Sequence, residues 1–378
     1  MDDVIISDDR QSIILCENGK NHRFHGIWLL DNAPSARDAG NGQRLLSFAE
    51  LPADDTATTI HDAAIADGVV TLQIGAPSQT IAFDASWLIA HIYDQQDQRA
   101  AGWVEPTITT WTNDINVPEA DFEQIRVDDT ALCEWLSDIR AYGFAKLTNG
   151  PVRDGALLEI VDLFGYVRET NYGRLFNVRS EVNPINLAYT GLGLQAHTDN
   201  PYRDPVPTLQ ILYCLENSAT GGESQVVDGF AAAQQLQESN SEAFTLLTRY
   251  PVRFTYSGAA GVTLTSRKPI IELRSDGELR AVHFNNRSIA PLTDVPFDEM
   301  PAFYNAIKAF SGCIDAPENQ VHFKLAPGES FIVDNQRVMH GRNGYEGAGT
   351  RWLQGCYPER DGLYSKLHDL EEKGLGNE

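Results

Sequence analysis

Apolar and polar residues alternate through the first 95 residues, and this pattern predicts short strands separated by turns. The clearest runs are SIILCENGK at 12–20, GVVTLQIG at 68–75 and TIAFDASWL at 80–88. A stretch rich in Gln and Asp follows at 93–102 and is typical of a linker. We therefore expect a small β-rich N-terminal domain over residues 1–95 and a second domain over residues 105–378.

Helical and extended patterns are mixed in the second domain. Apolar residues at helical spacing over 131–142 end at Gly143 and predict a helix. The other predicted helices cover 154–168, 230–249 and 297–311, and the predicted strands cover 144–148, 208–216, 223–229, 251–258, 328–334 and 351–357. Separated strands without β-α-β alternation favour a mainly β fold with inserted helices, a jelly-roll (double-stranded β-helix) core, over a doubly wound sheet.

The charge excludes some classes of partner. The 378 residues carry a formal net charge of -24, and an acidic surface repels nucleic acid and anionic membranes. We therefore expect neither nucleic acid nor membrane as a partner, and any anionic ligand must meet a local basic pocket.

The cysteines and the N-terminus indicate a compartment. The five cysteines are far apart, odd in number and without a CxxC pair, which is typical of a reduced chain. The N-terminus has no basic region before an apolar stretch, and nowhere do about 18 apolar residues follow one another. We expect a cytoplasmic protein.

The candidate chemistry begins with a histidine and an aspartate two positions apart. In an extended segment, the side chains of His197 and Asp199 would leave the sheet on one face. A second histidine, His340, follows a strand candidate more than a hundred residues later and would complete the two-histidine, one-carboxylate triad that binds iron(II). An HxD pair alone is weak evidence, because it arises often by chance.

An arginine near the C-terminus strengthens this interpretation. Arg351 lies on a predicted strand shortly after His340. 2-Oxoglutarate chelates iron through one end, so its distal carboxylate needs a permanently charged, bidentate partner. The other seven histidines have no comparable carboxylate and arginine nearby, and we expect them to be structural or surface residues: His22, His25, His61, His91, His283, His322 and His368.

Several segments together resemble the γ-butyrobetaine hydroxylase branch of the taurine-dioxygenase-like 2-oxoglutarate oxygenases. They are HTDNPYRDPVPTLQILYCLENSATGGESQVVDGF, DNQRVMHGRNGY, RWLQGCY, AYGFAKLTNG and HGIWLLDN. The resemblance covers nearly the whole chain. It implies Fe(II) on His197, Asp199 and His340, and it implies 2-oxoglutarate on Arg351, Ser224 and Leu212. It also implies O2 as co-substrate, leaves room for ascorbate, and implies a homodimer.

The resemblance also implies a small trimethylammonium substrate. Ring faces bind a quaternary ammonium well because it offers no hydrogen-bond donor. The family's aromatic cage corresponds to Tyr172, Phe176, Tyr189 and Tyr357, although each ring alone would more often be a packing residue. The remaining positions in the expected substrate site are Asn186, Tyr202, Asn285, Asn286 and Arg287.

The sequence departs from the family at its N-terminal zinc site. The positions expected to carry three cysteines are Ala33, Ser35 and Asp38, and no histidine lies near Gln79. These side chains cannot replace a thiolate set. We therefore predict that this chain binds no zinc.

A second departure concerns charge. Arg287 lies beside Asn285, and Arg203 follows the HxD pair closely. If either arginine points inward, it would suit the tetrahedral oxygens of a phosphonate, although surface ion pairs are the more common role of such arginines. This favours 2-(trimethylammonio)ethylphosphonate, hydroxylated at the carbon next to phosphorus, as the substrate.

Three alternatives stay open on the sequence. The first is hydroxylation of γ-butyrobetaine to L-carnitine, or the related trimethyllysine reaction. The second is a jelly-roll protein that binds betaines without catalysis. The third is a zinc hydrolase at the same triad, which leaves Arg351 without a role.

Overall fold

The computed structural model describes residues 3–52, 54–94, 99–179, 192–346 and 349–375. The chain divides into two compact units, Met1–Arg99 and Ala100–Glu378. Among the described residues, no helix is long and apolar enough to cross a membrane.

The N-terminal unit consists of two antiparallel three-stranded sheets, β1-β2-β3 and β4-β5-β6. Its strands are β1 (Asp3–Ile6), β2 (Ser12–Glu17), β3 (Lys20–His25), β4 (Ile60–Ala66), β5 (Val69–Ile74) and β6 (Gln79–Asp84). Its helices are α1 (Gly26–Asp31) and α2 (Ala85–Ala90), with 3-10 turns η1 (Pro34–Ala36) and η2 (Phe48–Glu50). The alternating residues predicted from the sequence form its core, as Ile13 and Leu15 are fully buried.

One run in this unit is only partly a strand. The predicted strand over 80–88 ends at Asp84, because the Asp84 side chain accepts the backbone N–H of Ser86 and caps α2.

The segment that follows α1 is held by polar side chains. Arg44 forms an ion pair with Asp31, and Arg37 donates to Asn32 at 3.0 Å. The carboxylate of Asp38 accepts two backbone N–H groups of its own turn. These contacts hold together the segment in which the family's zinc ligands would lie.

We expect the N-terminal unit to melt at the same temperature before and after treatment with a chelator, because these contacts need no metal. Calorimetry of the full chain, combined with metal analysis by mass spectrometry, tests this. The iron-dependent transition of the C-terminal unit is the internal reference. Stoichiometric zinc, lost together with a lower N-terminal melting temperature, would contradict the prediction.

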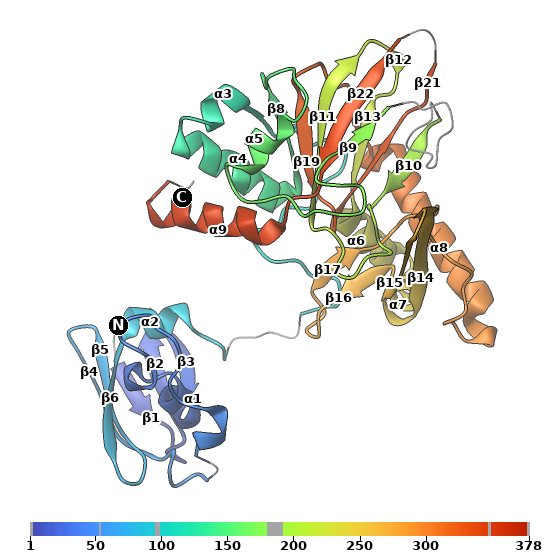
Figure 1. The fold of residues 1–378 in the computed structure, drawn as a ribbon. Coiled ribbons are helices and arrows are strands. Elements are labelled where there is room, and N and C mark those ends of the chain that lie inside the picture. The colour runs from blue at the N-terminus through green and yellow to red at the C-terminus, as the bar shows by residue number, and fades with distance from the viewer. Residues whose placement is uncertain (1–2, 53, 95–98, 180–191, 347–348, 376–378) are drawn as a thin grey trace. The chain divides into compact units, whose positions relative to one another are not determined.

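Two sheets form the centre of the C-terminal unit (Figure 1). The larger has the order β7-β8-β19-β11-β22-β9 and contains β7 (Glu119–Asp121), β8 (Phe144–Thr148), β9 (Phe176–Val178), β11 (Leu209–Asn217), β19 (Ser330–Asp334) and β22 (Arg351–Cys356). The smaller has the order β10-β20-β13-β18 and contains β10 (Leu194–His197), β13 (Ser224–Asp228), β18 (Val321–Phe323) and β20 (Val338–Arg342). The three additional strand pairs are β12 (Thr220–Gly221) with β21 (Tyr345–Glu346), β14 (Pro251–Ala259) with β15 (Val262–Pro269), and β16 (Ile271–Leu273) with β17 (Leu279–Val282).

The two sheets pack face to face and helices cover them. Leu212 and Phe331 of the larger sheet pack in one cluster with Val226 and Val338 of the smaller sheet. Figure 1 shows α4 and α9 beside the larger sheet, and α8 lies near β10 of the smaller one. The helices are α3 (Phe122–Ile125), α4 (Asp129–Tyr142), α5 (Leu157–Val161), α6 (Gly229–Ser239), α7 (Ser241–Arg249), α8 (Met300–Asp315) and α9 (Arg360–Glu372), with 3-10 turns η4 (Phe297–Glu299) and η5 (Pro317–Asn319). The predicted jelly-roll core is confirmed.

Strand β11 is buried on both faces, because it lies between the other sheet and the helices. Ile211 and Tyr213 pack in the cluster that includes α4 and α9. Leu212 and Cys214 point the opposite way, into the space between the sheets. This explains why the sequence TLQILYCL is almost continuously apolar.

Two helix predictions need correction. The pattern over 230–249 is two helices, because Asn240 leaves the helical conformation and its side chain caps α7 through the N–H of Ala243. The helix predicted over 154–168 is the five-residue α5, which starts after a left-handed turn at Gly155 (φ 76°) and gives way to further turns.

A buried ion pair joins four parts of this unit. Arg337 and Asp228 are 2% and 1% exposed, and the guanidinium donates twice to the carboxylate, at 3.1 and 2.8 Å. Arg337 also donates to the carbonyls of Ala141 and Thr109. The pair therefore ties the ends of β13 and α4, and the segment at Thr109, to the turn between β19 and β20.

Replacing Arg337 by alanine is expected to lower the free energy of unfolding by about 3–5 kcal/mol, since the Asp228 carboxylate would stay buried without its partner. Urea unfolding followed by circular dichroism measures the loss. The matched control is Arg253→Ala, which breaks an exposed pair with Asp294 and should cost less than about 1 kcal/mol. Equal losses in the two variants would refute the structural role of the buried pair.

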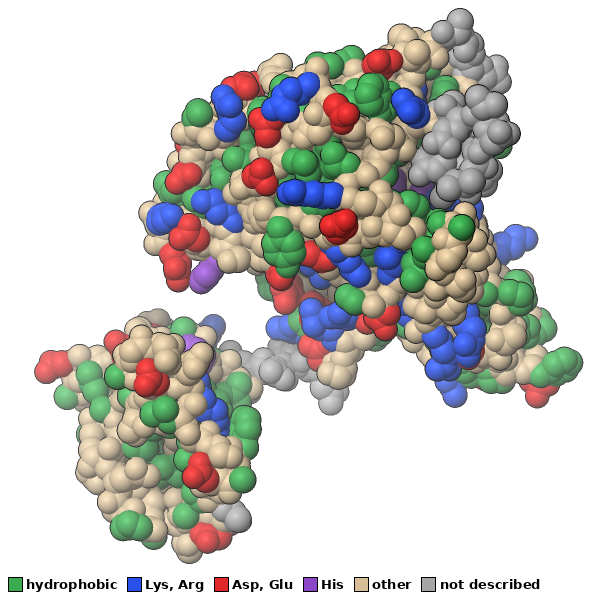
Figure 2. All heavy atoms as spheres, viewed as in Figure 1, with side chains coloured by type: hydrophobic (Ala, Val, Ile, Leu, Met, Phe, Trp, Pro, Cys, Tyr) green, Lys and Arg blue, Asp and Glu red, His purple; other side chains and the backbone are tan. Residues whose placement is uncertain are grey.

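Charged side chains of both signs are interspersed on the face of the molecule drawn in Figure 2. Several form exposed ion pairs, such as those of Arg253 and Arg267 with Asp294. Such pairs leave little positive charge for a ligand. The buried Arg342 and Arg351 differ from these exposed arginines.

Candidate active site

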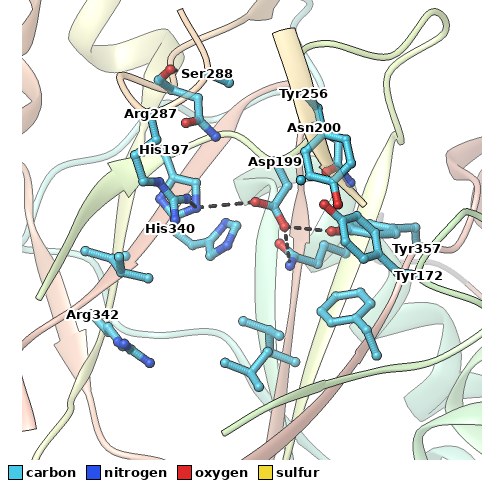
Figure 3. Close-up of a pocket in the computed structure, with 18 of the residues that line it drawn as sticks. Tyr172, His197, Asp199, Asn200, Tyr256, Arg287, Ser288, His340, Arg342 and Tyr357 are labelled. Atoms are coloured by element: carbon cyan, nitrogen blue, oxygen red, sulfur yellow. Dashed lines mark hydrogen bonds and ion pairs between the residues drawn. The ribbon is translucent and has the colours of Figure 1, made fainter. Parts of the chain in front are cut away.

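The two predicted histidines and the aspartate meet at the end of the smaller sheet. Strands β10 and β20 are antiparallel, and His197 and His340 are direct partners in their register. Asp199 lies two residues beyond His197, just past the end of β10. One ligand atom of each residue lies within 4.8 Å of the other two. Figure 3 shows the three side chains converging on one space.

A glycine allows the two strands to approach at this point. A Cβ atom on Gly341 would lie 2.5 Å from the carbonyl oxygen of Leu194. Any larger residue next to His340 would push β10 away. The sequence HG in β20 is therefore required by the close packing of the strands that carry the histidines.

The electrostatics of the triad suit a divalent metal. Burial opposes the charge of Asp199, but its contact with the His197 side chain and the charge of Arg287 hold the pKa of Asp199 well below its ordinary value. Burial and the neighbouring His197 lower the pKa of His340 to about 3. A carboxylate and neutral imidazoles are the forms that bind iron(II).

The tautomer of His197 fits the same role. Its Nδ1 lies 2.8 Å from the backbone carbonyl of Gln195, which can only accept a hydrogen bond. Nδ1 therefore carries a proton, which leaves Nε2, 3.3 Å from Oδ1 of Asp199, as the nitrogen that would bind a metal. A carbonyl on the far nitrogen is the usual support of a metal-binding histidine.

The backbone on either side of Asp199 is held by two distant segments. The side chain of Asn335 accepts the N–H of Asp199 and donates to its carbonyl. Thr198 bonds the backbone of Phe284 in both directions. We did not predict a role for Asn335, and its only signal was a polar residue directly after the buried strand FIVD.

A positively charged region lies beside the triad. Arg351 is 7% exposed, burial lowers its pKa, and its Nε has no hydrogen-bond partner among the described residues. Ser224 and Leu212 line the same cavity. Gly222 (φ 72°) makes room for the arginine, because a Cβ there would lie 3.3 Å from Cδ of Arg351.

A second arginine in this region was not predicted. Arg342 follows the HG sequence on β20 and lines the cavity. Burial and then the charge of Arg351 lower its pKa to about 10, so it stays positive at neutral pH. The two guanidinium carbons lie 5.1 and 5.9 Å from the ring centre of Tyr345. Two close positive charges suit a dianion.

Aromatic rings form another wall of the cavity, which measures about 500 Å³. Tyr172 and Phe176 have ring centres 6.3 Å apart, and the centres of Phe176 and Tyr357 are 5.0 Å apart. Tyr202 and Tyr256 are stacked at 5.0 Å. Four of these five residues were predicted, whereas Tyr256 lies on a strand whose alternation gave no sign of its role.

The third wall comes from the segment after β17. Asn285, Arg287 and Ser288 line the cavity, and Arg287 reaches within 2.7 Å of Nε2 of His197. The β14–β15 hairpin is attached to this segment, because Thr255 donates to the carbonyl of Ser288 and Ala290 donates to that of Arg253.

The structure leaves some of the predicted substrate residues outside the cavity. Asn286 is exposed and bonds Gln195 instead. Arg203 lies behind the aromatic wall, 5.9 Å from the ring centres of Tyr172 and Tyr202, and does not line the cavity. Asn186 and Tyr189 lie outside the described residues.

The sequence profile described as "Taurine catabolism dioxygenase TauD, TfdA family" matches residues 107–357. The chain belongs to this family. Its members are Fe(II)- and 2-oxoglutarate-dependent oxygenases, so this TauD/TfdA dioxygenase uses Fe(II), 2-oxoglutarate and O2. The family decides against the non-catalytic binding protein and the zinc hydrolase.

Similar proteins indicate to which branch of the family the chain is related. The γ-butyrobetaine dioxygenase of Pseudomonas sp. (strain AK-1) is 35% identical over 359 residues, which cover 94% of this chain and 92% of that protein. The human γ-butyrobetaine dioxygenase is 31% identical over 371 residues, covering 95% and 94%. The mouse mitochondrial trimethyllysine dioxygenase is 30% identical over 349 residues, covering 90% and 80%. The predicted resemblance to the γ-butyrobetaine hydroxylase branch is confirmed.

A solved structure, that of PvcB from Pseudomonas aeruginosa, aligns with a TM-score of 0.48 at 16% identity and covers 68% of this chain and 94% of its own.

Replacing His340 by alanine is expected to weaken binding of Mn²⁺, used as a redox-stable probe, by more than about 100-fold, because removal of a direct ligand costs more than the 10- to 100-fold lost with outer partners. Titration calorimetry measures the affinity. The control is His368→Ala, which removes an exposed histidine on α9. Unchanged Mn²⁺ affinity in a folded His340→Ala variant would exclude His340 as a ligand.

Proposed function

We propose that this dioxygenase hydroxylates a small trimethylammonium zwitterion, with γ-butyrobetaine as the best-supported substrate and L-carnitine as its product. The observation that carries the proposal is the shared cavity, in which an aromatic wall, the His–Asp–His triad and a polar wall surround one space. The names of the similar proteins, γ-butyrobetaine and trimethyllysine dioxygenases, agree with this reading.

The iron would be held by Nε2 of His197, a carboxylate oxygen of Asp199 and an imidazole nitrogen of His340. Bound iron(II) supplies the oxidising chemistry, in which O2 converts 2-oxoglutarate to succinate and carbon dioxide and hydroxylates a substrate C–H bond. Arg351 would bind the distal carboxylate of 2-oxoglutarate, Ser224 would donate a further hydrogen bond to it, and Leu212 would pack against its methylene groups. Arg342 adds a second positive charge beside that carboxylate.

The aromatic wall is suited to an ammonium group because its hydroxyl groups are engaged elsewhere. The hydroxyls of Tyr172 and Tyr202 bond each other at 3.0 Å, and Tyr202 donates to Asn200. The hydroxyl of Tyr357 donates to Asp199. The rings thus offer π faces to the cavity, and a quaternary ammonium, which cannot accept or donate a hydrogen bond, binds such faces.

The polar wall would bind the anionic end of the substrate. Asn285 is 5% exposed and its Nδ2 donates to the carbonyl of Thr198. Its Oδ1 can only accept a hydrogen bond, so in this arrangement the anion would depend on Arg287. Arg287 supplies the positive charge on this wall. With both ends bound, the methylene groups between them lie next to the triad, and their position would decide which carbon is hydroxylated.

The phosphonate expected from the sequence becomes the second candidate. The similar proteins favour the carboxylate, and only one of the two arginines behind that expectation lines the cavity. Arg287 is that arginine, and its charge is the specific observation that keeps 2-(trimethylammonio)ethylphosphonate in consideration. A homodimer, a cytoplasmic location and a role for ascorbate stay predictions from the sequence.

Comparison of the two substrates with iron(II) and 2-oxoglutarate present tests the proposal. We expect kcat/KM for γ-butyrobetaine to exceed that for the phosphonate by at least about 10-fold, equivalent to roughly 1.4 kcal/mol of transition-state binding. Succinate and hydroxylated product are both quantified by mass spectrometry.

The variant Arg287→Gln is the matched control, because it removes the positive charge but keeps a hydrogen-bond donor. It should reduce turnover of the doubly charged phosphonate more than turnover of the carboxylate. Preference for the phosphonate in the unmodified enzyme would reverse the order of the two candidates. Failure to hydroxylate either compound while 2-oxoglutarate is consumed would reject the trimethylammonium proposal.

A further inference from the structure

The two oxygens of the Asp199 carboxylate have different surroundings. Oδ2 accepts two hydrogen bonds, one from the hydroxyl of Tyr357 and one from Nε2 of Gln210, each 2.8 Å long. Oδ1 faces Nε2 of His197 instead. Figure 3 shows Asp199 between His197 and Tyr357, with dashed lines to both.

Both donors are rigidly held. Gln210 is 2% exposed and lies near the start of β11, where its backbone pairs with Val333 of β19. Tyr357 is 4% exposed, directly follows β22 and packs its ring against Phe176. Side chains fixed in this way lose little entropy when they form a hydrogen bond.

The direction of each hydrogen bond follows from charge. An ionised carboxylate can only accept, so the amide of Gln210 must turn its NH2 group toward Oδ2. The phenol O–H of Tyr357 likewise donates, because Oδ2 of an ionised carboxylate offers no proton. Hydrogen bonds to a charged acceptor are the stronger kind.

We infer that Gln210 and Tyr357 are positioning residues that fix the rotation of the Asp199 carboxylate, so that Oδ2 is engaged by the protein and Oδ1 alone is presented to the metal. A carboxylate without these donors could rotate and bind through both oxygens, which would fill a coordination position needed by 2-oxoglutarate or O2. The two side chains thereby keep the remaining coordination positions of the metal free for 2-oxoglutarate and O2.

Tyr357 has a second role, and this step rests on the proposed function. Its ring is part of the aromatic wall, and its hydroxyl holds a metal ligand. A cation against the ring polarises the O–H group and strengthens its hydrogen bond to Oδ2. Binding of the ammonium group would therefore strengthen the hydrogen bond from Tyr357 to Asp199. Occupancy of the aromatic wall would in this way be coupled to the reactivity of the iron site.

Mn²⁺ affinity tests the positioning role without any substrate. The variants are Tyr357→Phe, which keeps the ring, and Gln210→Met, which keeps the side-chain length. We expect each to weaken Mn²⁺ binding by about 10-fold and the double variant by more than the product of the single effects, because either remaining donor still holds Oδ2. The matched control is Tyr213→Phe, which removes a buried hydroxyl that donates to the carbonyl of Pro151 and lies outside the cavity.

Two further readouts separate positioning from general damage. The visible spectrum of the Co²⁺-substituted enzyme should change in Tyr357→Phe and Gln210→Met and stay unchanged in Tyr213→Phe. Circular dichroism and thermal melting establish that each variant is folded. Wild-type Mn²⁺ affinity and Co²⁺ spectrum in the folded double variant would overturn the inference.

The coupling role is tested by the ratio of 2-oxoglutarate consumed to product formed. We expect γ-butyrobetaine to accelerate 2-oxoglutarate consumption strongly in the wild type and about 10-fold less in Tyr357→Phe, with more succinate formed per hydroxylated product. An unchanged acceleration and ratio would refute the coupling. If Mn²⁺ affinity falls as expected but γ-butyrobetaine has no effect on the wild type, the proposed substrate is wrong and the positioning role stands.

Discussion

The register between β10 and β20 is the constraint on which the site depends. It sets His197 opposite His340, and a shift by one residue would turn one of these side chains to the other face of the sheet. The same strand β20 pairs with β13, where Val226 is opposite His340 and Asp228 is opposite Val338. The buried Arg337–Asp228 pair lies at that end of the strand pair. The geometry of the metal site is thus supported by an ion pair that contacts none of the three metal-binding residues.

The features that could be predicted from the sequence have local signals or a recognisable motif. The helix that ends at Gly143 is one, because Gly143 takes the left-handed conformation (φ 74°) that ends a helix. The grouping of His197, Asp199, His340 and Arg351 is another, because the chemistry of 2-oxoglutarate demands that set. Leu212, Ser224 and most of the aromatic wall followed from the family motifs, and the structure brings them into the same cavity.

The remaining features depend on contacts between distant segments. Tyr256, Gln210 and Asn335 are ordinary residues in the sequence, and only the pairing of strands far apart in the chain turns them toward Asp199 or the cavity. Arg203 and Arg287 looked equivalent as neighbours of site residues, yet one lies behind the aromatic wall and the other inside the cavity. Asn240 interrupts a helical pattern because its side chain bonds the backbone locally, and composition alone does not reveal this competition.

The β14–β15 hairpin would determine which length of substrate fits the cavity. Tyr256 on β14 belongs to the aromatic wall, and the next residues back along the strand are bonded to the segment that carries Arg287 and Ser288. One element would therefore set the separation between the proposed ammonium and anion subsites, and that element is not part of the sheet that carries His197 and His340. A change in the length of this hairpin would alter that separation while leaving the paired strands of His197 and His340 in place.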